Sequence, residues 1–191
     1  MNKPRVELLI RELLSELGED PDREGLRRTP ARMAASLDFL TSGYRTDREA
    51  LINNAYFTQD SDSMVVLRDI EFYSMCEHHM LPFFGHVHIG YLPQGKVFGI
   101  SKLARLVEMY SRRLQLQERM TEQIANVIME SIDALGVGVM VEGQHLCMMM
   151  RGVQKHGSIM VTSCMLGTFR SDSRTRSEFL NLVSRPRPEM H

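Results

Sequence analysis

Two consecutive amphipathic helices in the middle of the chain, with strand-like segments on both sides, constrain the fold more than any other feature. Apolar side chains recur at helical spacing from Leu103 to Leu114 and again from Met120 to Leu135, and we expect Gly136 to end the second helix. The segments rich in β-formers are 64–73, 84–92, 137–142, near 145–151 and near 158–166. Strands, two helices and further strands in this order predict an α+β fold with an antiparallel sheet.

The ends of the chain have less apolar material than the middle. A helix is expected over 4–17 with Gly18 as its cap, and a second helix begins with Thr29 as N-cap and Pro30 at the first position. A short helix is expected near 173–183. The predicted organisation is a helical appendage at 1–60, a main domain at 61–184 and a disordered tail at 185–191.

Composition excludes several classes of function. The 191 residues carry a formal net charge of −1, which argues against a general nucleic-acid surface. No apolar run approaches the roughly 20 residues that a membrane-spanning helix needs. Three widely spaced cysteines do not suggest a disulfide framework, so we expect a reducing cytoplasm, where such cysteines bind metals or act in catalysis.

The stretch MCEHHMLPFFGH at 75–86 contains a candidate metal-binding pair. Cys76 and His79 have C-x-x-H spacing, and on a strand these two positions point to opposite faces. We therefore expect the strand to break into a tight turn after Tyr73, which would place both side chains on one side. Glu77, between them, has no clear role. Taken alone, a buried cysteine beside a surface histidine explains the pair equally well.

The stretch QHLCMMMR at 144–151 supplies a third candidate ligand. Read as a strand, it places His145, Cys147 and Arg151 on one face. Two thiolates and one imidazole suit zinc and leave a fourth position open for water. His78 and His145 are then free for acid–base chemistry. The remaining candidates are weaker: Cys164 is expected to be buried, and His86 and His88 to be structural sheet residues.

The stretch FGISKLARL at 98–106 is a candidate anion site. Ser101 is expected to cap the helix that follows, with Lys102 and Arg105 near its positive end, and Arg151 can join from the strand face. The alternative is an ordinary capped helix with solvated basic residues.

Gln117 and Glu118 precede the second central helix and have two interpretations. They are either ordinary polar residues at a helix start, or a group that binds the N–H groups of a purine or pterin base. Spacing alone does not decide between the two.

Long contiguous motifs resemble the GTP cyclohydrolase I family. They are GEDPDREGLRRTPARM, DIEFYSMCEHHMLPFFGH, GISKLARLVEMYSRRLQLQERMTEQIA, GQHLCMMMRGVQKHGS and RSEFLNL. The resemblance implies the tunnelling fold, an antiparallel sheet with two helices on one side, in which strands from several subunits join into a barrel. It also implies a homodecamer of two pentamers with active sites between subunits, and conversion of GTP and water to formate and 7,8-dihydroneopterin triphosphate, the first step of folate-type pterin biosynthesis.

The resemblance assigns roles to individual residues. One zinc ion per subunit would be held by Cys76, His79 and Cys147. His145 would move protons at the purine imidazole, His78 would assist ribose opening, and Ser101 would act in the later sugar rearrangement. The triphosphate contacts would be Lys102, Arg105, Arg151 and Arg32, and the guanine anchor Gln117 and Glu118.

The chain departs from the family pattern at Gly143, which replaces a usual alanine, and at Cys164, where a small non-thiol residue is usual. Two other functions are alternatives to a zinc enzyme that acts on GTP. A non-catalytic module would use zinc structurally, normally with four protein ligands. A related nitrile reductase would use NADPH and a nucleophilic cysteine without zinc.

Overall fold

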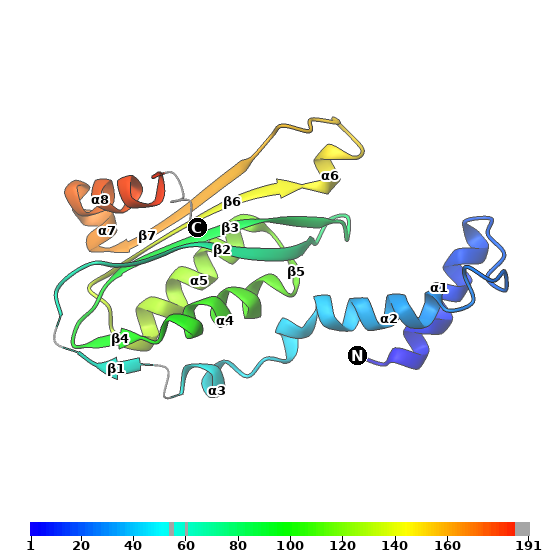
Figure 1. Ribbon diagram of the computed structural model, residues 1–191, viewed down its shortest axis with the longest axis horizontal. Coiled ribbons are helices and arrows are strands. Elements are labelled where there is room, and N and C mark those ends of the chain that lie inside the picture. The colour runs from blue at the N-terminus through cyan, green and yellow to red at the C-terminus, as the bar shows by residue number, and fades with distance from the viewer. Residues whose placement is uncertain (54–55, 60, 186–191) are drawn as a thin grey trace, which may run out of the picture.

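A five-stranded sheet forms the centre of the computed structural model, which describes residues 1–53, 56–59 and 61–185 (Figure 1). The strand order is β5-β2-β3-β6-β7. The strands are β2 Val65–Cys76, β3 Pro82–Leu92, β5 Leu114–Gln115, β6 Gly136–His145 and β7 Met160–Gly167. Neighbours pair antiparallel, except that the short β5 runs parallel to β2. The predicted α+β class and antiparallel sheet are confirmed.

The two central helices, α4 Ile100–Ser111 and α5 Gln117–Ile132, cover one face of the sheet (Figure 1). The alternating residues Val87, Ile89 and Tyr91 of β3 are buried in the same core cluster as the apolar stripes of both helices. Burial of these stripes supplies the main favourable term for folding. The helical spacing in the sequence identified the inward faces of both helices, but Leu114 belongs to β5, and Leu135 follows the end of α5 and is exposed.

Two further helices, α7 Thr168–Ser171 and α8 Ser173–Val183, cover part of the opposite face (Figure 1). Phe169 and Phe179 are fully buried there. A Cβ added at Gly90 would lie 2.6 Å from a Phe179 ring carbon, so this glycine allows the ring to reach the sheet. His88 is buried on the sheet, and its Nδ1 accepts a hydrogen bond from the Asp69 N–H at 3.2 Å, which confirms its structural role.

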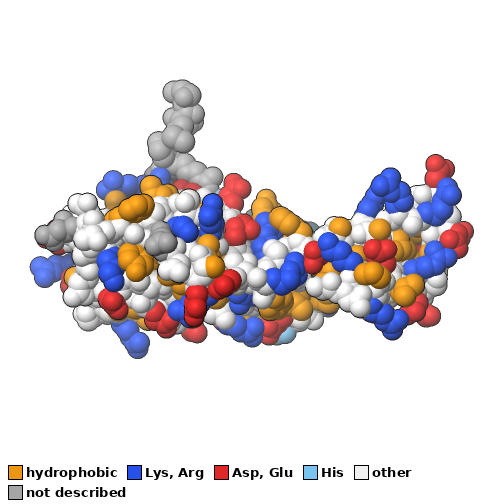
Figure 2. Space-filling model, turned by 90° about the horizontal axis from the view of Figure 1, so that it is seen from below, with side chains coloured by type: hydrophobic (Ala, Val, Ile, Leu, Met, Phe, Trp, Pro, Cys, Tyr) orange, Lys and Arg blue, Asp and Glu red, His pale blue; other side chains and the backbone are white. Residues whose placement is uncertain are grey.

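The appendage projects from the body as an arm, along which basic and acidic side chains are interspersed (Figures 1 and 2). It consists of α1 Lys3–Glu16, α2 Thr29–Leu40, η1 Ser42–Arg45 and α3 Arg48–Ile52, followed by β1 Tyr56–Thr58, which pairs with β4 Lys96–Phe98. Gly18 follows the end of α1 with φ +83°, as its expected capping role requires. Thr29 is not the N-cap of α2. The cap is Arg28, and no side chain bonds the free N–H groups.

Three local expectations are wrong. Helix α5 ends at Ile132 because Asp133 adopts a left-handed conformation with φ 49°, and Gly136 already belongs to β6. The strand expected near 145–151 is instead the end of β6 followed by a helical turn, α6 Leu146–Met149. Strand β2 continues three residues beyond Tyr73, to Cys76. Of the predicted tail, residues 186–191 lie outside the described residues.

None of the helices in the described ranges is both long and apolar enough to span a membrane.

Gly43 fixes the junction between the appendage and the body. Its N–H donates to the Arg112 carbonyl at 3.0 Å, and its carbonyl accepts from the Arg113 guanidinium at 2.9 Å. A Cβ at this position would lie 2.1 Å from the Met109 carbonyl oxygen, which belongs to the backbone of α4 and cannot yield locally.

We expect Gly43→Ala to lower the free energy of unfolding by about 1–3 kcal/mol, because the added methyl group forces two backbone segments apart. Urea titration followed by circular dichroism measures this change. Gly157→Ala is the matched control, since nothing lies within 4 Å of a Cβ there. Equal stability of the two variants would show that the junction is not close-packed.

Candidate metal centre

A tight turn at the end of β2 brings Cys76 and His79 together. The N–H groups of His79 and Met80 both point to the Cys76 carbonyl, at 3.3 and 2.8 Å, and Met80 closes the turn with φ 54°. The Cys76 Sγ then lies 3.8 Å from the His79 Nδ1. The expectation that C-x-x-H spacing requires a turn is confirmed, although the turn begins after Cys76 rather than after Tyr73.

The strand order explains how Cys147 joins this pair. Strands β2 and β6 both pair antiparallel with β3, so they run in the same direction and end at the same edge of the sheet. Their ends are two strand spacings, or about 10 Å, apart. The turn after Cys76 and the helical turn α6 reach toward each other over the beginning of β3. Cys147 therefore arrives from a helical turn and not, as predicted, from one face of a strand.

The Sγ atoms of Cys76 and Cys147 and a ring nitrogen of His79 all lie within 4.8 Å of one another, which is a group that can hold a metal ion. Within the described ranges, no other such group of histidine, cysteine and carboxylate side chains occurs. Cys76 is buried, Cys147 is half-buried and His79 is exposed, so the group is open on one side. Burial raises the pKa of the Cys147 thiol, and neighbouring Cys76 raises it further. A bound divalent cation would reverse this effect and stabilise both thiolates, so the donor set fits a metal.

His145, the last residue of β6, lies beside the metal group on a rigid support. Its ring stacks on the Phe83 ring, with centroids 4.6 Å apart and an interplanar angle of 5°. Its Nε2 lies 2.9 Å from the Oε1 of Gln117, the first residue of α5. Burial lowers the pKa of His145, and the charge of Glu118 acts in the opposite direction. A lowered pKa favours the neutral imidazole, which can accept a proton and so suits the predicted acid–base role.

Glu77 has a partner that the sequence did not reveal. Its carboxylate forms a bidentate ion pair with the Arg119 guanidinium, at 2.5 and 3.0 Å, and this pair lowers the pKa of Glu77. The pair ties the turn that carries His79 to the first turn of α5. Glu77 therefore helps to hold the turn that carries His79. No sequence pattern indicated this ion pair, because Glu77 and Arg119 are far apart in the chain.

A cavity of about 270 Å³ adjoins the metal group. Its lining residues are His145, Cys147, Met148, Met149, Lys155, Ser158, Ile159 and Met160. This volume is close to the lower end of the range for small-molecule sites.

The predicted anion-binding residues lie elsewhere in the same chain. Helix α4 begins at Ile100 with Gly99 as N-cap, so Ser101 is in the first turn and is not the cap. The other end of α4 leads to the end of β2 that carries the metal group, where Leu114 pairs with Met75. Ten helical residues separate Ser101 from Ser111, which places Ser101 about 15 Å further along the body.

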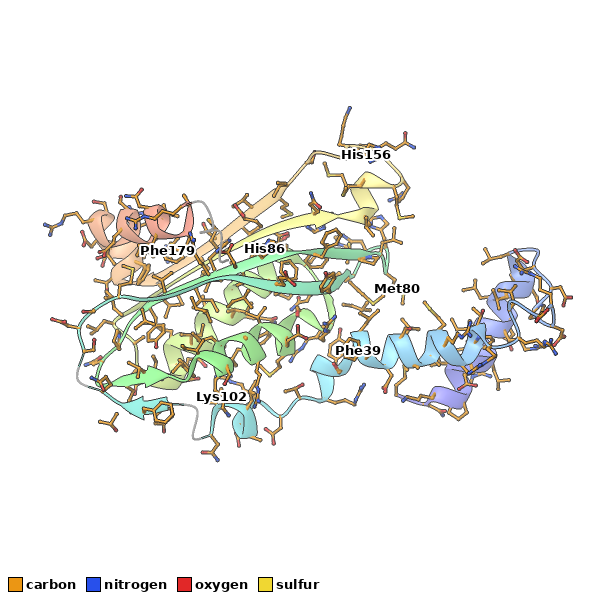
Figure 3. All side chains as sticks on the ribbon, viewed as in Figure 1. Phe39, Met80, His86, Lys102, His156 and Phe179 are labelled. Carbon is orange, nitrogen blue, oxygen red and sulfur yellow. The ribbon has the colours of Figure 1, made fainter. Side chains whose placement is uncertain are left out.

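Lys102 shares this remote position. Figure 3 shows Lys102 well away from Met80, which closes the metal-binding turn. The Lys102 Nζ donates to the Leu51 carbonyl at 3.1 Å, whereas Arg105 is exposed. One chain thus does not bring Ser101, Lys102 or Arg105 to the metal group.

The other predicted site residues lie in three places. His78 and Glu118 are exposed near the metal group, on the ligand turn and in the first turn of α5. Arg151 follows α6, with its Nη1 3.5 Å from the Cys147 carbonyl. Arg32 is exposed on α2 of the appendage. Gln117 differs from all of these because it is only 1% exposed.

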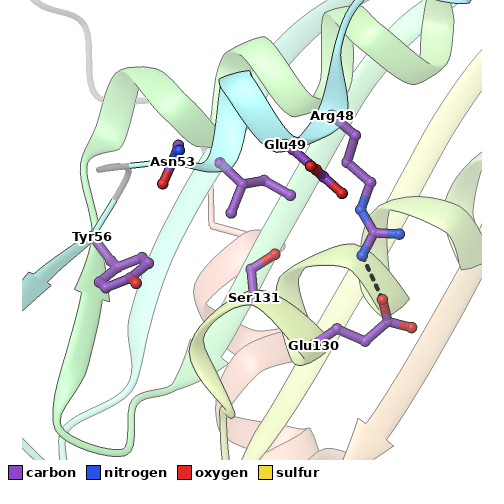
Figure 4. Close-up of a pocket in the computed structure, with 7 residues that line it drawn as sticks. Arg48, Glu49, Asn53, Tyr56, Glu130 and Ser131 are labelled. Atoms are coloured by element: carbon purple, nitrogen blue, oxygen red, sulfur yellow. Dashed lines mark hydrogen bonds and ion pairs between the residues drawn. The ribbon is translucent and has the colours of Figure 1, made fainter.

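A larger cavity, of about 560 Å³, lies between α3, β1 and α5 (Figure 4). Its lining residues are Arg48, Glu49, Ile52, Asn53, Tyr56, Glu130 and Ser131. An ion pair between Arg48 and Glu130 crosses it. Glu130 is thirteen helical residues from Gln117, or about 20 Å along α5, so this cavity is separate from the metal group.

The fold and the site together define a class: an α+β protein with a half-open Cys₂His metal group beside a supported histidine. The model of the family described as GTP cyclohydrolase I matches residues 6–184. The chain belongs to this family of enzymes.

Curated relatives agree with this assignment. GTP cyclohydrolase 1 of Methylococcus capsulatus is 57% identical over 180 residues, covering 94% of this chain and 97% of the relative. GTP cyclohydrolase 1 of a Synechococcus strain is 56% identical over 186 residues, covering 97% of this chain and 81% of the relative. Among solved structures, the apo form of archaeosine synthase QueF-Like is 21% identical with a TM-score of 0.46, covering 56% of this chain and 97% of that chain, a likeness too low to support any conclusion.

Proposed function

We propose that this protein hydrolyses GTP at C8 of guanine and rearranges the product to 7,8-dihydroneopterin triphosphate, releasing C8 as formate. The observation that carries the proposal is the half-open Cys76–His79–Cys147 group with His145 beside it. A non-catalytic zinc module would normally close its site with a fourth protein ligand. A family of this name and relatives about 55% identical over nearly the whole chain support the same reaction.

We propose zinc, one ion per subunit, as the metal held by these three ligands. Two thiolates and an imidazole match its preference for sulfur and nitrogen donors. When bound, zinc supplies Lewis-acid activation of water. Three free cysteines in the chain accord with a reducing compartment, and we assign the protein to the cytoplasm.

We propose for the surrounding residues the roles that the family resemblance implies. His145 exchanges a proton at the purine imidazole, from a position supported by Phe83. His78, exposed on the ligand turn, assists opening of the ribose, and Ser101 acts in the sugar rearrangement. The exposed carboxylate of Glu118 accepts hydrogen bonds from the N–H groups of guanine. The triphosphate is bound by Lys102, Arg105, Arg151 and Arg32.

These residues can act together only if a second chain contributes to the site. In one chain, Lys102 and Arg105 lie in the first half of α4, whereas the other end of this helix leads to the end of the sheet that carries the metal group. Strand β7 is an open edge of the sheet with exposed Met160 and Val161, which favours pairing with another copy. We propose a homo-oligomer, a decamer of two pentamers, whose strands join into a barrel and whose active sites lie between subunits.

The activity can be tested directly. We expect the zinc-loaded protein to release formate from GTP and to form a pterin that fluoresces after oxidation. Incubation with a chelator is the control and should abolish both signals, because the Lewis acid is removed. Absence of formate from fully metallated protein would contradict the proposed reaction, and retained activity without metal would contradict the role of zinc.

A further inference from the structure

Gln117 is a buried amide whose orientation is fixed by its partners. The side chain is only 1% exposed. Its Nε2 donates to the carbonyl oxygens of Val141 at 3.1 Å and Met160 at 2.9 Å, and lies 3.2 Å from the Thr162 Oγ1. A carbonyl oxygen can only accept, so the NH₂ group must face β6 and β7. The amide oxygen consequently faces the other way.

That oxygen determines which nitrogen of His145 carries a proton. The Oε1 of Gln117 lies 2.9 Å from the His145 Nε2, and an amide oxygen cannot donate. A hydrogen bond between them therefore requires a proton on Nε2. In a neutral imidazole, the Nδ1 is then the one nitrogen with a free lone pair.

We propose that Gln117 is a positioning residue that holds His145 as the Nε2–H tautomer and leaves Nδ1 to exchange the proton with substrate. The Phe83 ring fixes the imidazole plane, and Gln117 fixes the rotation and the tautomer within that plane. This inference rests on the proposed function for the catalytic role of His145. It removes Gln117 from the residues that touch guanine and leaves that task to the exposed Glu118, because both polar atoms of the buried amide are engaged within the chain.

Gly143 is part of the same arrangement. A Cβ at this position would lie 2.3 Å from the Gln117 Oε1 and 3.7 Å from the His145 Nε2. The Gln117 side chain therefore packs directly against the backbone of β6 at this glycine.

The tautomer can be measured without substrate. Solid-state ¹⁵N NMR of protein labelled in histidine separates the Nδ1–H and Nε2–H tautomers, and His145→Gln identifies the signal. We expect wild-type His145 to be protonated on Nε2. Gln117→Met, which removes both polar atoms at similar volume, should give a mixture of tautomers. An Nδ1–H signal in the wild type, or an unchanged signal in Gln117→Met, would overturn the proposal.

Gln115→Met is the matched control. Gln115 is also a buried amide, 2% exposed, but it bonds the Tyr110 carbonyl and the Gln123 side chain instead of His145. This variant should leave the His145 tautomer as in the wild type. A mixture of tautomers in the control as well would show that loss of any buried amide disturbs His145, and would overturn the specific role of Gln117.

Kinetics provide the second measurement. Gln117→Met should lower kcat about 100-fold while KM for GTP and zinc content stay unchanged, because the acid–base group is misplaced and the substrate contacts are kept. A raised KM with unchanged kcat would show that Gln117 binds substrate instead. If the wild type itself releases no formate, the proposed function fails, whereas the NMR result still decides the hydrogen bond.

Discussion

Cys147→Ser should lose bound zinc and formate release together, with activity falling by about 10³-fold or more. A serine hydroxyl is a poor replacement for a thiolate, and two remaining ligands do not hold the ion. The lost Lewis acid accounts for several kcal/mol of transition-state stabilisation, and each 1.36 kcal/mol is a factor of ten in rate. Metal analysis of the purified variant and the formate assay, performed on the same sample, measure the two losses.

Cys164→Ser is the control for this experiment. Cys164 lies half-buried in β7, and burial raises the pKa of its thiol. It is not part of the metal group, so this variant should keep both zinc and activity. Zinc retained at full stoichiometry in Cys147→Ser would show that the ligand set is wrong.

Co-expression of two inactive variants should restore about a quarter of the wild-type activity. Arg105→Glu changes the end of α4 that we propose binds the triphosphate, and Cys147→Ser changes the proposed metal group. Because we propose that each site takes these two halves from different chains, about a quarter of randomly mixed interfaces have both halves intact. The formate assay on doubly tagged, purified mixed oligomers measures the recovery.

The control combines two variants whose substitutions both affect the metal-group half of the proposed site. His145 and Cys147 lie on one chain at one sheet edge, so His145→Ala mixed with Cys147→Ser should recover no activity. His145→Ala alone should keep its zinc. Failure of Arg105→Glu and Cys147→Ser to complement each other would place the complete site within a single chain and contradict the shared site.

The structure brings together the three residues predicted as metal ligands, but Cys147 reaches the group from a different local structure than the sequence suggested. The alternation in HLCMMMR resembles a strand, while the actual helical turn spans only Leu146–Met149. A single turn has too few residues for its period to be distinguished. Cys147 still lies close to Cys76 because β2 and β6 end on the same side of the sheet. This closeness depends on the strand order and not on the local structure around Cys147.

Caps and buried polar contacts were predicted least well. Thr29 and Ser101 have side chains suited to N-caps, yet Arg28 and Gly99 occupy these positions. For Gln117 the sequence left open an ordinary polar residue at a helix start and a base-binding group, and neither interpretation indicated that its side chain is buried within the chain. Such outcomes depend on which segments of the chain pack nearby, and a single sequence does not contain that information.

Because its ligands come from the ends of two strands separated by β3, the metal group exists only when the sheet is assembled in register. A slip of one residue between β3 and β6 would turn the side chains of β6 to the opposite face. We therefore expect metal uptake to be coupled to folding. If the proposed zinc ion binds here, the rate at which it becomes tightly bound during refolding would report when β2, β3 and β6 have formed one sheet.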